Sequence, residues 1–150
     1  MASSAAFKNI TVSNVFNTAG KTPIPATLYL AVSKTEPDAN GGSVTEPAGG
    51  SYARVPITPS FTAAPTDGVV RNMSEIQFAE STSNWGVVTH WAVFGDPTGG
   101  SALLWGVMRN LKENTPNYGD PEPRSVETGT ILRVKPQDLY FALYDRQAGD

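Results

Sequence analysis

Glycine and proline interrupt this chain so often that an architecture of long helices is not expected. The 150 residues include 14 glycines and 12 prolines, and these two residues mark turns and end regular elements. The pieces between them are short, and many alternate apolar with polar residues, which is the period of a β-strand. A chain of this length makes one domain and can bury a core without disulfide bonds. The sequence therefore predicts a single all-β domain over residues 1–150.

Alternation predicts strands along most of the chain. The segment 27–33 directs Leu28, Leu30 and Val32 to one face of a sheet and the residues between them to the other face. Further short strands are expected at residues 52–57, 61–64, 69–72 and 75–78. Because proline cannot donate a ladder hydrogen bond, Pro56 predicts that its strand lies at a sheet edge.

Two hairpins complete the predicted strands. The segment 85–94 is apolar on both faces, the turn 95–100 follows it, and the apolar segment 102–108 returns, so residues 85–108 are predicted to form one hairpin. Its first strand is expected to place Val87, Thr89, Trp91 and Val93 on one face and Val88, His90, Ala92 and Phe94 on the other. A second hairpin is expected to join residues 130–134 to residues 138–145 through residues 135–137.

Seven to nine short strands with regular turns predict one antiparallel β-sandwich, of the jelly-roll or immunoglobulin-like kind. The alternation also predicts the core of the sandwich. Its members are Leu28, Leu30, Val32, Val93, Leu104, Leu139, Phe141 and Leu143.

The first twenty residues are predicted to form a short N-terminal helix or arm. Residues 3–19 have helical spacing of apolar side chains, Ser4 can cap the helix, and Gly20 marks its expected end. Phe7, Ile10, Val15 and Phe16 are then available to dock on a neighbouring subunit.

Composition excludes several kinds of site and partner. The chain has no cysteine and one histidine, which excludes thiolate nucleophiles, cysteine-bound zinc and a centre built from several histidines of one chain. The formal net charge of -3 argues against nucleic acid as a partner. No secretory signal or membrane-spanning segment is recognised, so no membrane partner is expected.

The residues that could carry chemistry are better explained as structural ones. His90 could act as a base only with a nucleophile and a carboxylate beside it, and its position inside an aromatic strand favours a half-buried, hydrogen-bonded role. The tripeptide Gly20-Lys21-Thr22 resembles the end of a phosphate-binding loop, but Val15 stands where that motif needs a glycine.

For the carboxylates and tryptophans, too, a structural role is favoured over a functional one. A calcium loop at residues 36–38 lacks the regular spacing of calcium ligands. A glycosidase pair is also weighed, but most carboxylates stand in turns, where they solubilise the chain or cap loops. They are Glu36, Asp38, Glu46, Asp67, Asp96, Asp120 and Glu122. Trp85, Trp91 and Trp105 could form a sugar platform, although core or interface packing is favoured. No catalytic, metal or cofactor-binding residue is therefore assigned.

Two long loops carry the prediction of a partner. Residues 34–51 and 111–125 are rich in glycine and proline and lack strand patterns, and loops of this length tend to be functional or ordered by a partner. A homo-oligomer, most simply a trimer, is expected on this basis.

Several blocks in this order carry a resemblance to a known group of proteins. They are Pro25-Ala26-Thr27-Leu28-Tyr29-Leu30-Ala31-Val32, Gly49-Gly50-Ser51-Tyr52-Ala53-Arg54, Trp85-Gly86-Val87-Val88-Thr89-His90-Trp91-Ala92-Val93-Phe94 and Leu103-Leu104-Trp105-Gly106. Together they resemble the small virion proteins of tailed bacteriophages that are often labelled tail-fibre-like proteins. The resemblance covers most of residues 7–145.

The resemblance implies a non-enzymatic structural protein of a virion, assembled in the host cytoplasm. Three placements remain open. The favoured one is a capsid decoration or cement protein bound to the major capsid protein. The alternatives are a tail, baseplate or short tail-fibre protein, and a module that binds carbohydrate on the host surface.

Overall fold

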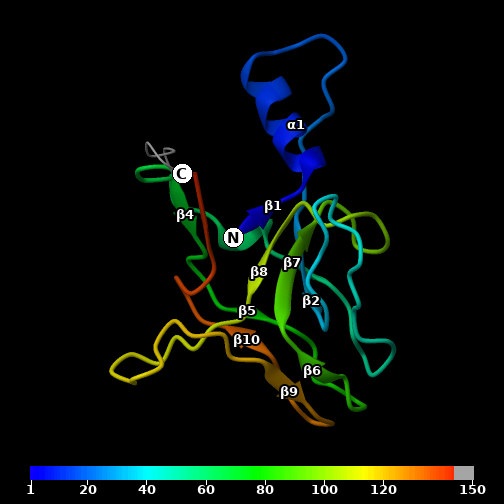
Figure 1. Ribbon diagram of the computed structural model, residues 1–150, viewed down its shortest axis with the longest axis vertical. Helices are drawn as coiled ribbons and strands as arrows, with labels where there is room; N and C mark the ends of the chain where they lie inside the picture. Colours follow the sequence, from blue (N-terminus) through cyan, green and yellow to red (C-terminus); the bar gives the residue numbers. More distant parts are fainter. Residues whose placement is uncertain (144–150) are drawn as a thin grey trace.

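The computed structural model describes residues 1–143. Along these residues eleven short strands accompany one α-helix and one 3-10 turn (Figure 1). The elements are β1 (Ala2–Ser3), α1 (Ala5–Val15), β2 (Tyr29–Ser33), β3 (Val55–Pro56), the 3-10 turn (Thr58–Ser60), β4 (Val69–Arg71), β5 (Ile76–Gln77), β6 (Gly86–Val88), β7 (His90–Phe94), β8 (Leu104–Val107), β9 (Arg124–Val126), β10 (Arg133–Val134) and β11 (Tyr140–Ala142).

The strands form one five-stranded sheet and three two-stranded ladders, all antiparallel. The larger sheet has the order β1-β8-β7-β2-β3, and the ladders are β10-β5, β11-β4 and β6-β9. The prediction of an antiparallel, sandwich-like all-β fold with a short N-terminal helix is confirmed. Strands outnumber the seven to nine expected because several ladders are only two residues long. No helix within residues 1–143 is long and apolar enough to cross a membrane.

The five-stranded sheet is buried on both faces. On one face, Leu30, Val32, Val93 and Leu104 pack into the main core with residues of the two-stranded ladders. On the other face, a smaller cluster is formed by Ala31, Ala92, Phe94, Ala102 and Trp105. This double burial explains why the central strands β2 and β7 carry almost no polar residues.

The loop 34–51 covers the smaller cluster. Val44 packs against the cluster, and the amide of Ala102 donates a hydrogen bond to the carbonyl oxygen of Gly41 at 2.8 Å. A Cβ on Gly41 would lie 2.0 Å from the oxygen of Ala102, and Gly41 has a φ of +78°. This loop was expected to need a partner surface, but it is ordered by the sheet of its own chain.

The predicted strand 85–94 is broken at Thr89, so its continuous alternation is wrong. β6 pairs with β9, whereas β7 pairs with β2 and β8 in the larger sheet. Thr89 bonds instead to the flanking segments. Its amide donates to the carbonyl oxygen of Ser33, and its carbonyl oxygen accepts from the amide of Met108, each at 2.9 Å. Because of this one-residue interruption, the side chains of β6 no longer alternate in step with those of β7. Val88 and Val93 therefore share the main core, and Val87 is 52% exposed.

The hairpin predicted for residues 130–145 does not form within the described residues. β10 pairs with β5, and β11 pairs with β4. Asn72 explains the arrangement, because its fully buried side chain donates to the carbonyl of Lys135 at 2.8 Å and accepts from the amide of Leu139 at 2.9 Å. These bonds hold the connection between β10 and β11 against the β4–β5 segment. Residues 144–145 of the expected hairpin lie outside the described residues.

Most of the predicted core is confirmed. Leu30, Val32, Val93, Leu104 and Leu139 are buried, and Leu28 and Phe141 are partly buried against the same core. The prediction that Leu143 belongs to the core is wrong, because this residue follows the last residue of β11 and its side chain is 68% exposed.

The strand expected at residues 61–64 is also absent. The 3-10 turn Thr58–Ser60, which has a proline in its first turn, precedes this segment. The ring of Phe61 lies 5.4 Å from that of Phe141, so the apolar residue is explained by core packing.

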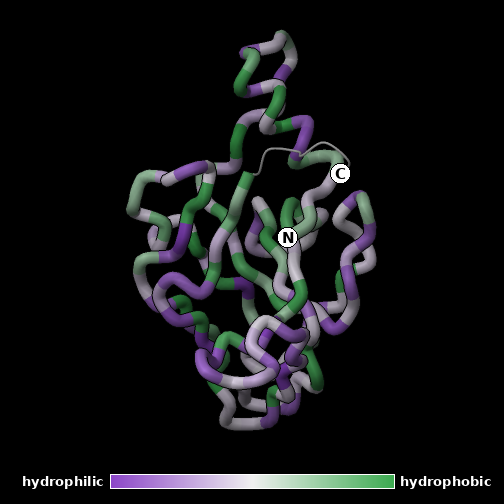
Figure 2. Tube along the Cα trace, turned by 60° about the vertical axis from the view of Figure 1, so that its left-hand side comes forward, coloured by the Kyte–Doolittle hydropathy of each residue, from purple (hydrophilic) through white to green (hydrophobic). Residues whose placement is uncertain are grey.

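Helix α1 begins where the sequence predicts and ends earlier. The side chain of Ser4 accepts a hydrogen bond from the amide of Phe7 at 3.1 Å, which caps the helix. The helix ends at Val15 rather than near Gly20, because Asn17 takes a left-handed φ of +51°. It projects from the sheets (Figure 1) and carries hydrophobic residues along its length (Figure 2). Phe7 and Ile10 pack on the core, whereas Val12, Val15 and Phe16 are exposed.

Candidate functional site

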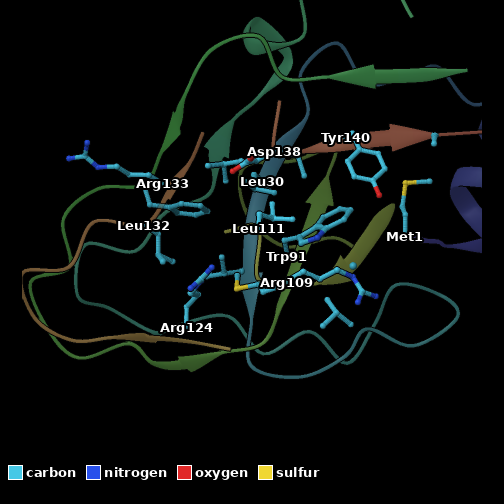
Figure 3. Close-up of a pocket in the computed structure, with 18 residues that line it drawn as sticks. Met1, Leu30, Trp91, Arg109, Leu111, Arg124, Leu132, Arg133, Asp138 and Tyr140 are labelled. Atoms are coloured by element: carbon cyan, nitrogen blue, oxygen red, sulfur yellow. The ribbon is translucent and has the colours of Figure 1, made fainter. Parts of the chain in front are cut away.

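An apolar cavity opens beside the larger sheet. It has a volume of about 350 Å³ and lies between β2, β7 and β8 on one side and the segment 132–142 on the other (Figure 3). Leu30, Trp91, Leu132 and Leu139 contribute to its apolar lining. A cavity of this size is within the range of small-molecule sites, which combine apolar walls with a few polar groups.

Polar residues surround this apolar lining. Arg109, Arg124, Arg133, Asp138 and Tyr140 all border the cavity. Figure 3 shows the guanidinium of Arg124 turned into the space between Leu132 and Trp91, while that of Arg133 extends away from it. Arg124 thus faces the cavity, and its side chain is 40% exposed.

Neighbouring groups hold these polar side chains in place. Arg124 pairs with Glu122 through one terminal nitrogen at 3.2 Å, which leaves its other N–H donors for further contacts. The guanidinium carbon of Arg71 lies 4.6 Å from the centre of the Tyr140 ring. Arg71 also donates to the carbonyl of Gln137 at 3.0 Å, so Tyr140 is supported by a residue of the adjacent strand β4.

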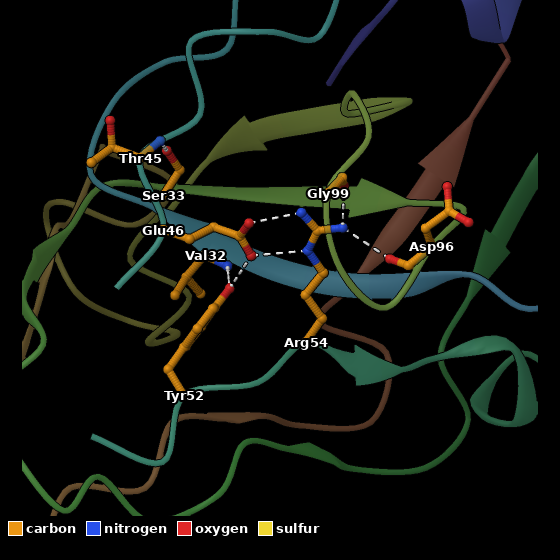
Figure 4. A network of polar contacts seen from close by, with 8 residues as sticks. All are labelled: Val32, Ser33, Thr45, Glu46, Tyr52, Arg54, Asp96 and Gly99. Carbon is orange, nitrogen blue, oxygen red and sulfur yellow. Dashed lines mark hydrogen bonds and ion pairs between the residues drawn. The ribbon is translucent and has the colours of Figure 1, made fainter. Parts of the chain in front are cut away.

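A second polar centre joins Arg54 to Glu46 (Figure 4). The guanidinium donates through Nε and Nη2 to the two carboxylate oxygens, at 3.0 and 2.7 Å. Its remaining terminal nitrogen donates to the carbonyls of Asp96 and Gly99 at 2.9 and 2.8 Å. The Arg54 side chain is 4% exposed, and its guanidinium carbon lies 3.5 Å from the centre of the Phe94 ring. One buried arginine thus fastens the loop 34–51 and the turn 95–100 to the sheet.

Tyr52 completes this centre. Its hydroxyl donates to Glu46 at 2.7 Å and accepts from the amide of Val32 at 3.2 Å. Burial raises the pKa of Tyr52 far above its ordinary value, and the hydrogen bond to Glu46 raises it further. Burial also raises the pKa of Glu46, but the bonds from Arg54 and Tyr52 and the charge of Arg54 together hold it below its ordinary value. The centre therefore joins a carboxylate, a guanidinium and a phenol through direct hydrogen bonds.

The chain matches the family model described as podophage GP4 fiber I protein gp80, over residues 2–142. The chain belongs to this fibre I family. A comparison with curated proteins gave no match. The match spans α1, the larger sheet and both long loops. It also includes the polar residues named at the cavity and those of the Arg54, Glu46 and Tyr52 centre.

Membership in the fibre I family makes the chain a bacteriophage structural protein and a component of the virion. It confirms the resemblance to tail-fibre-like proteins. It also gives the block Gly49-Gly50-Ser51-Tyr52-Ala53-Arg54 a physical meaning, because this block supplies the two side chains that bind Glu46.

The histidine of this fibre I protein has the structural role that its strand predicts. His90 is partly buried in β7, and its Nδ1 lies 2.8 Å from the hydroxyl of Thr89. The pair lies at the break between β6 and β7, where it helps to fix the turn of the chain.

The three tryptophans do not form one platform. Trp85 and Trp105 are 2% and 5% exposed and belong to different core clusters. Trp91 is partly buried, forms a T-shaped pair with Phe141 at 5.7 Å between ring centres, and borders the cavity. Core packing is confirmed for the first two, and Trp91 is the tryptophan that borders the cavity.

The candidate calcium loop is organised by its own aspartate. Asp38 accepts hydrogen bonds from the amides of Asn40 and Gly42, at 2.9 and 3.0 Å, and from the hydroxyl of Ser43 at 3.0 Å. These bonds lower the pKa of Asp38. Within residues 1–143 no three acidic or histidine side chains gather as a metal site would require.

The remaining candidate carboxylates are dispersed. Glu36, Asp67, Asp96 and Asp120 are exposed in loops, as turn-forming residues are. The tripeptide 20–22 is exposed in the loop after α1, and the amine of Lys21 bonds to Asn17.

Sequence reasoning did not find the cavity. Its polar residues come from β9, from β10, from the segment after β8 and from the segment around β11, and no spacing in the sequence connects these elements. The one available signal was Trp91, a large aromatic side chain in a strand predicted to be buried on both faces.

Proposed function

We propose that this chain is a non-enzymatic tail-fibre subunit rather than a capsid decoration protein. The observation that carries the proposal is the match to a fibre family over residues 2–142. Nearly the whole chain is included, so the match reflects the complete fold and not one shared motif. Capsid decoration, the placement that the sequence favoured, is the alternative against which the fibre placement is tested below.

The projecting helix supports an attachment role. Val12, Val15, Phe16 and Ile24 are between 55% and 74% exposed on α1 and the loop that follows it. We name these four residues the arm patch. Exposed apolar residues gathered on a projecting segment are typical of a protein surface that is buried in an assembly. Phe7 and Ile10 fix the base of the helix to the core, so the arm patch is presented on an anchored element.

The arm patch is proposed to bury itself against a second copy or against the tail protein that carries the fibre. A homotrimer is the proposed state of the free subunit, because contact between copies would bury the exposed arm patch. Size-exclusion chromatography with light scattering is expected to give three times the chain mass of 15.9 kDa. A monomer at all concentrations would reject the trimer.

The location on the particle is tested with purified virions. Gold-labelled antibodies and quantitative gels are expected to place the chain at the tail, in a low number of copies that is a multiple of three or six. Hundreds of copies distributed over the capsid would overturn the fibre proposal in favour of the decoration role.

The arm patch is tested by substitution. Val15→Ser and Phe16→Ser are expected to leave the free energy of unfolding unchanged, because both side chains are more than 70% exposed, and to reduce incorporation into virions. Met73→Ser, which alters a 46% exposed apolar residue on the body, is the matched control and should be incorporated normally. Equal incorporation of all three variants would contradict attachment through the arm.

A further inference from the structure

We propose that the cavity beside Trp91 binds an acidic sugar residue, a pyranose that carries a carboxylate, with the carboxylate on Arg124. The sugar would belong to a polysaccharide of the bacterial surface. The proposal rests on one juxtaposition. The guanidinium of Arg124 faces an apolar cavity that Trp91 of β7 also borders (Figure 3).

The walls of the cavity fit one face of a sugar ring. A pyranose has apolar C–H faces and a rim of hydroxyl groups. Leu30, Leu132 and the indole of Trp91 offer apolar surface of this kind. The carboxylate of Asp138 and the hydroxyl of Tyr140 stand at the border, where they can accept and donate hydrogen bonds to ring hydroxyls.

The charge of the cavity selects an anion. The protein carries a net charge of -3, yet three of its six arginines border this one cavity. Two of them also pair with acidic residues, Arg124 with Glu122 and Arg133 with Glu75 at 3.7 Å. Arg124 keeps free N–H donors and faces inward, and a guanidinium binds a carboxylate through two parallel hydrogen bonds.

Charge also argues against the most obvious protein occupant, the projecting arm of a second copy. Residues 4–25 contain Lys8 and Lys21 and no acidic residue. A basic arm would meet the arginines of the cavity with like charge, which is unfavourable. An acidic sugar has the opposite sign and the right size.

The proposed fibre function supplies only the source of the sugar, since a fibre meets the bacterial surface. Binding itself is a property of the purified chain. Location on the virion does not depend on Arg124, so failure of the sugar proposal and failure of the fibre proposal are separate results.

The experiment titrates the purified chain with galacturonate, glucuronate, N-acetylneuraminate and short oligogalacturonates, followed by NMR and calorimetry. Neutral galactose and maltotetraose are the matched ligands without charge. At least one acidic ligand is expected to bind, to shift the indole signal of Trp91, and to bind more weakly as salt concentration rises.

Variants then test the assigned contact. Arg124→Gln is expected to weaken binding by about tenfold or more, and Arg124→Lys by less, because lysine keeps the charge but loses the paired geometry. Lys34→Gln removes one positive charge from an exposed position outside the cavity lining and should leave the affinity within about twofold. Thermal unfolding of each variant verifies that the fold is retained.

Several results would overturn the proposal. They are no binding by any acidic ligand, equal binding of the neutral sugars, or an affinity that Arg124→Gln leaves unchanged. Binding of phosphatidylglycerol vesicles in place of the sugars, lost in Arg124→Gln, would assign the cavity to anionic lipid and reject the sugar.

Discussion

The indole N–H of Trp85 donates to the carbonyl oxygen of Gly50 at 2.8 Å, across 35 residues of sequence. Trp85 is 2% exposed and meets Tyr52 edge to face at 5.2 Å between ring centres. Gly50 must approach the indole closely, with a φ of +61°. This contact joins the end of the long loop 34–51 to the main core.

The first prediction concerns this approach. A Cβ at position 50 would lie 2.3 Å from the hydroxyl of Ser83 and 2.8 Å from the indole nitrogen of Trp85. Gly50→Ala should therefore lower the free energy of unfolding by about 2–4 kcal/mol through overpacking and left-handed strain. Gly49→Ala, which has a φ of +73° and nothing within 4 Å of its Cβ, should cost about 1 kcal/mol. Urea unfolding measures both, and equal losses would show that the approach to Trp85 does not matter.

The second prediction concerns the charge of Glu46. Glu46→Gln leaves the buried Arg54 without its counter-charge, and the free energy of unfolding at pH 7 should fall by about 1–3 kcal/mol. Because the pKa of Glu46 is below its ordinary value in the folded state, its contribution is complete above the unfolded pKa and is lost as the pH falls through the folded pKa.

The difference between the native chain and Glu46→Gln should thus shrink as the pH is lowered from 6 to 3. Other carboxyls, such as Asp38, titrate in both proteins and cancel in the difference. Chemical unfolding at several pH values provides the measurement, and a difference that stays constant down to pH 3 would rule out this role for the Glu46 charge.

The third prediction separates two leucines that the sequence placed on one core face. Leu139 is 5% exposed and Leu143 is 68% exposed. Leu139→Ala should cost about 2–5 kcal/mol, whereas Leu143→Ala should change the free energy of unfolding by less than about 0.5 kcal/mol. Thermal unfolding of the two variants gives the comparison, and a large loss in Leu143→Ala would mean that the buried face of Leu139 and Phe141 continues through residue 143.

The fourth prediction tests the interruption at Thr89. Val88 is fully buried in the main core, and its neighbour Val87 is 52% exposed. Val88→Ala should cost about 2 kcal/mol through lost burial and a small cavity, and Val87→Ala should cost less than about 0.5 kcal/mol. If the strand were continuous, as its alternation suggests, Val87 would share the face of Val93 in the main core and its replacement would also be costly, so the loss measured for Val87→Ala decides the register.

Local features of the fold could be predicted well. The Ser4 cap of α1, the hairpin of β7 and β8 and the edge position of Pro56 depend on residues close together in sequence or on one residue's own geometry. The same is true of the core residues in β2, whose period of two is visible without any partner.

Features that depend on distant partners could not be predicted. No sequence pattern singled out Asn72, which is buried and holds the connection between β10 and β11 through Lys135 and Leu139. The ion pair of Arg54 and Glu46 was not recognised, because seven residues lie between them and no regular element fixes their distance.

The sequence by itself determined that this chain is made of short strands with an N-terminal helix, and its blocks indicated a tailed-phage virion protein. Only the tertiary structure decided which strand pairs with which, which face of β6 is buried, and that Arg124 and Trp91 border one cavity. The physical reason is that alternation and turn residues act over a few neighbouring positions. Strand pairing and cavity walls depend instead on contacts between distant segments, and each such contact must overcome the entropy of closing the loop between them.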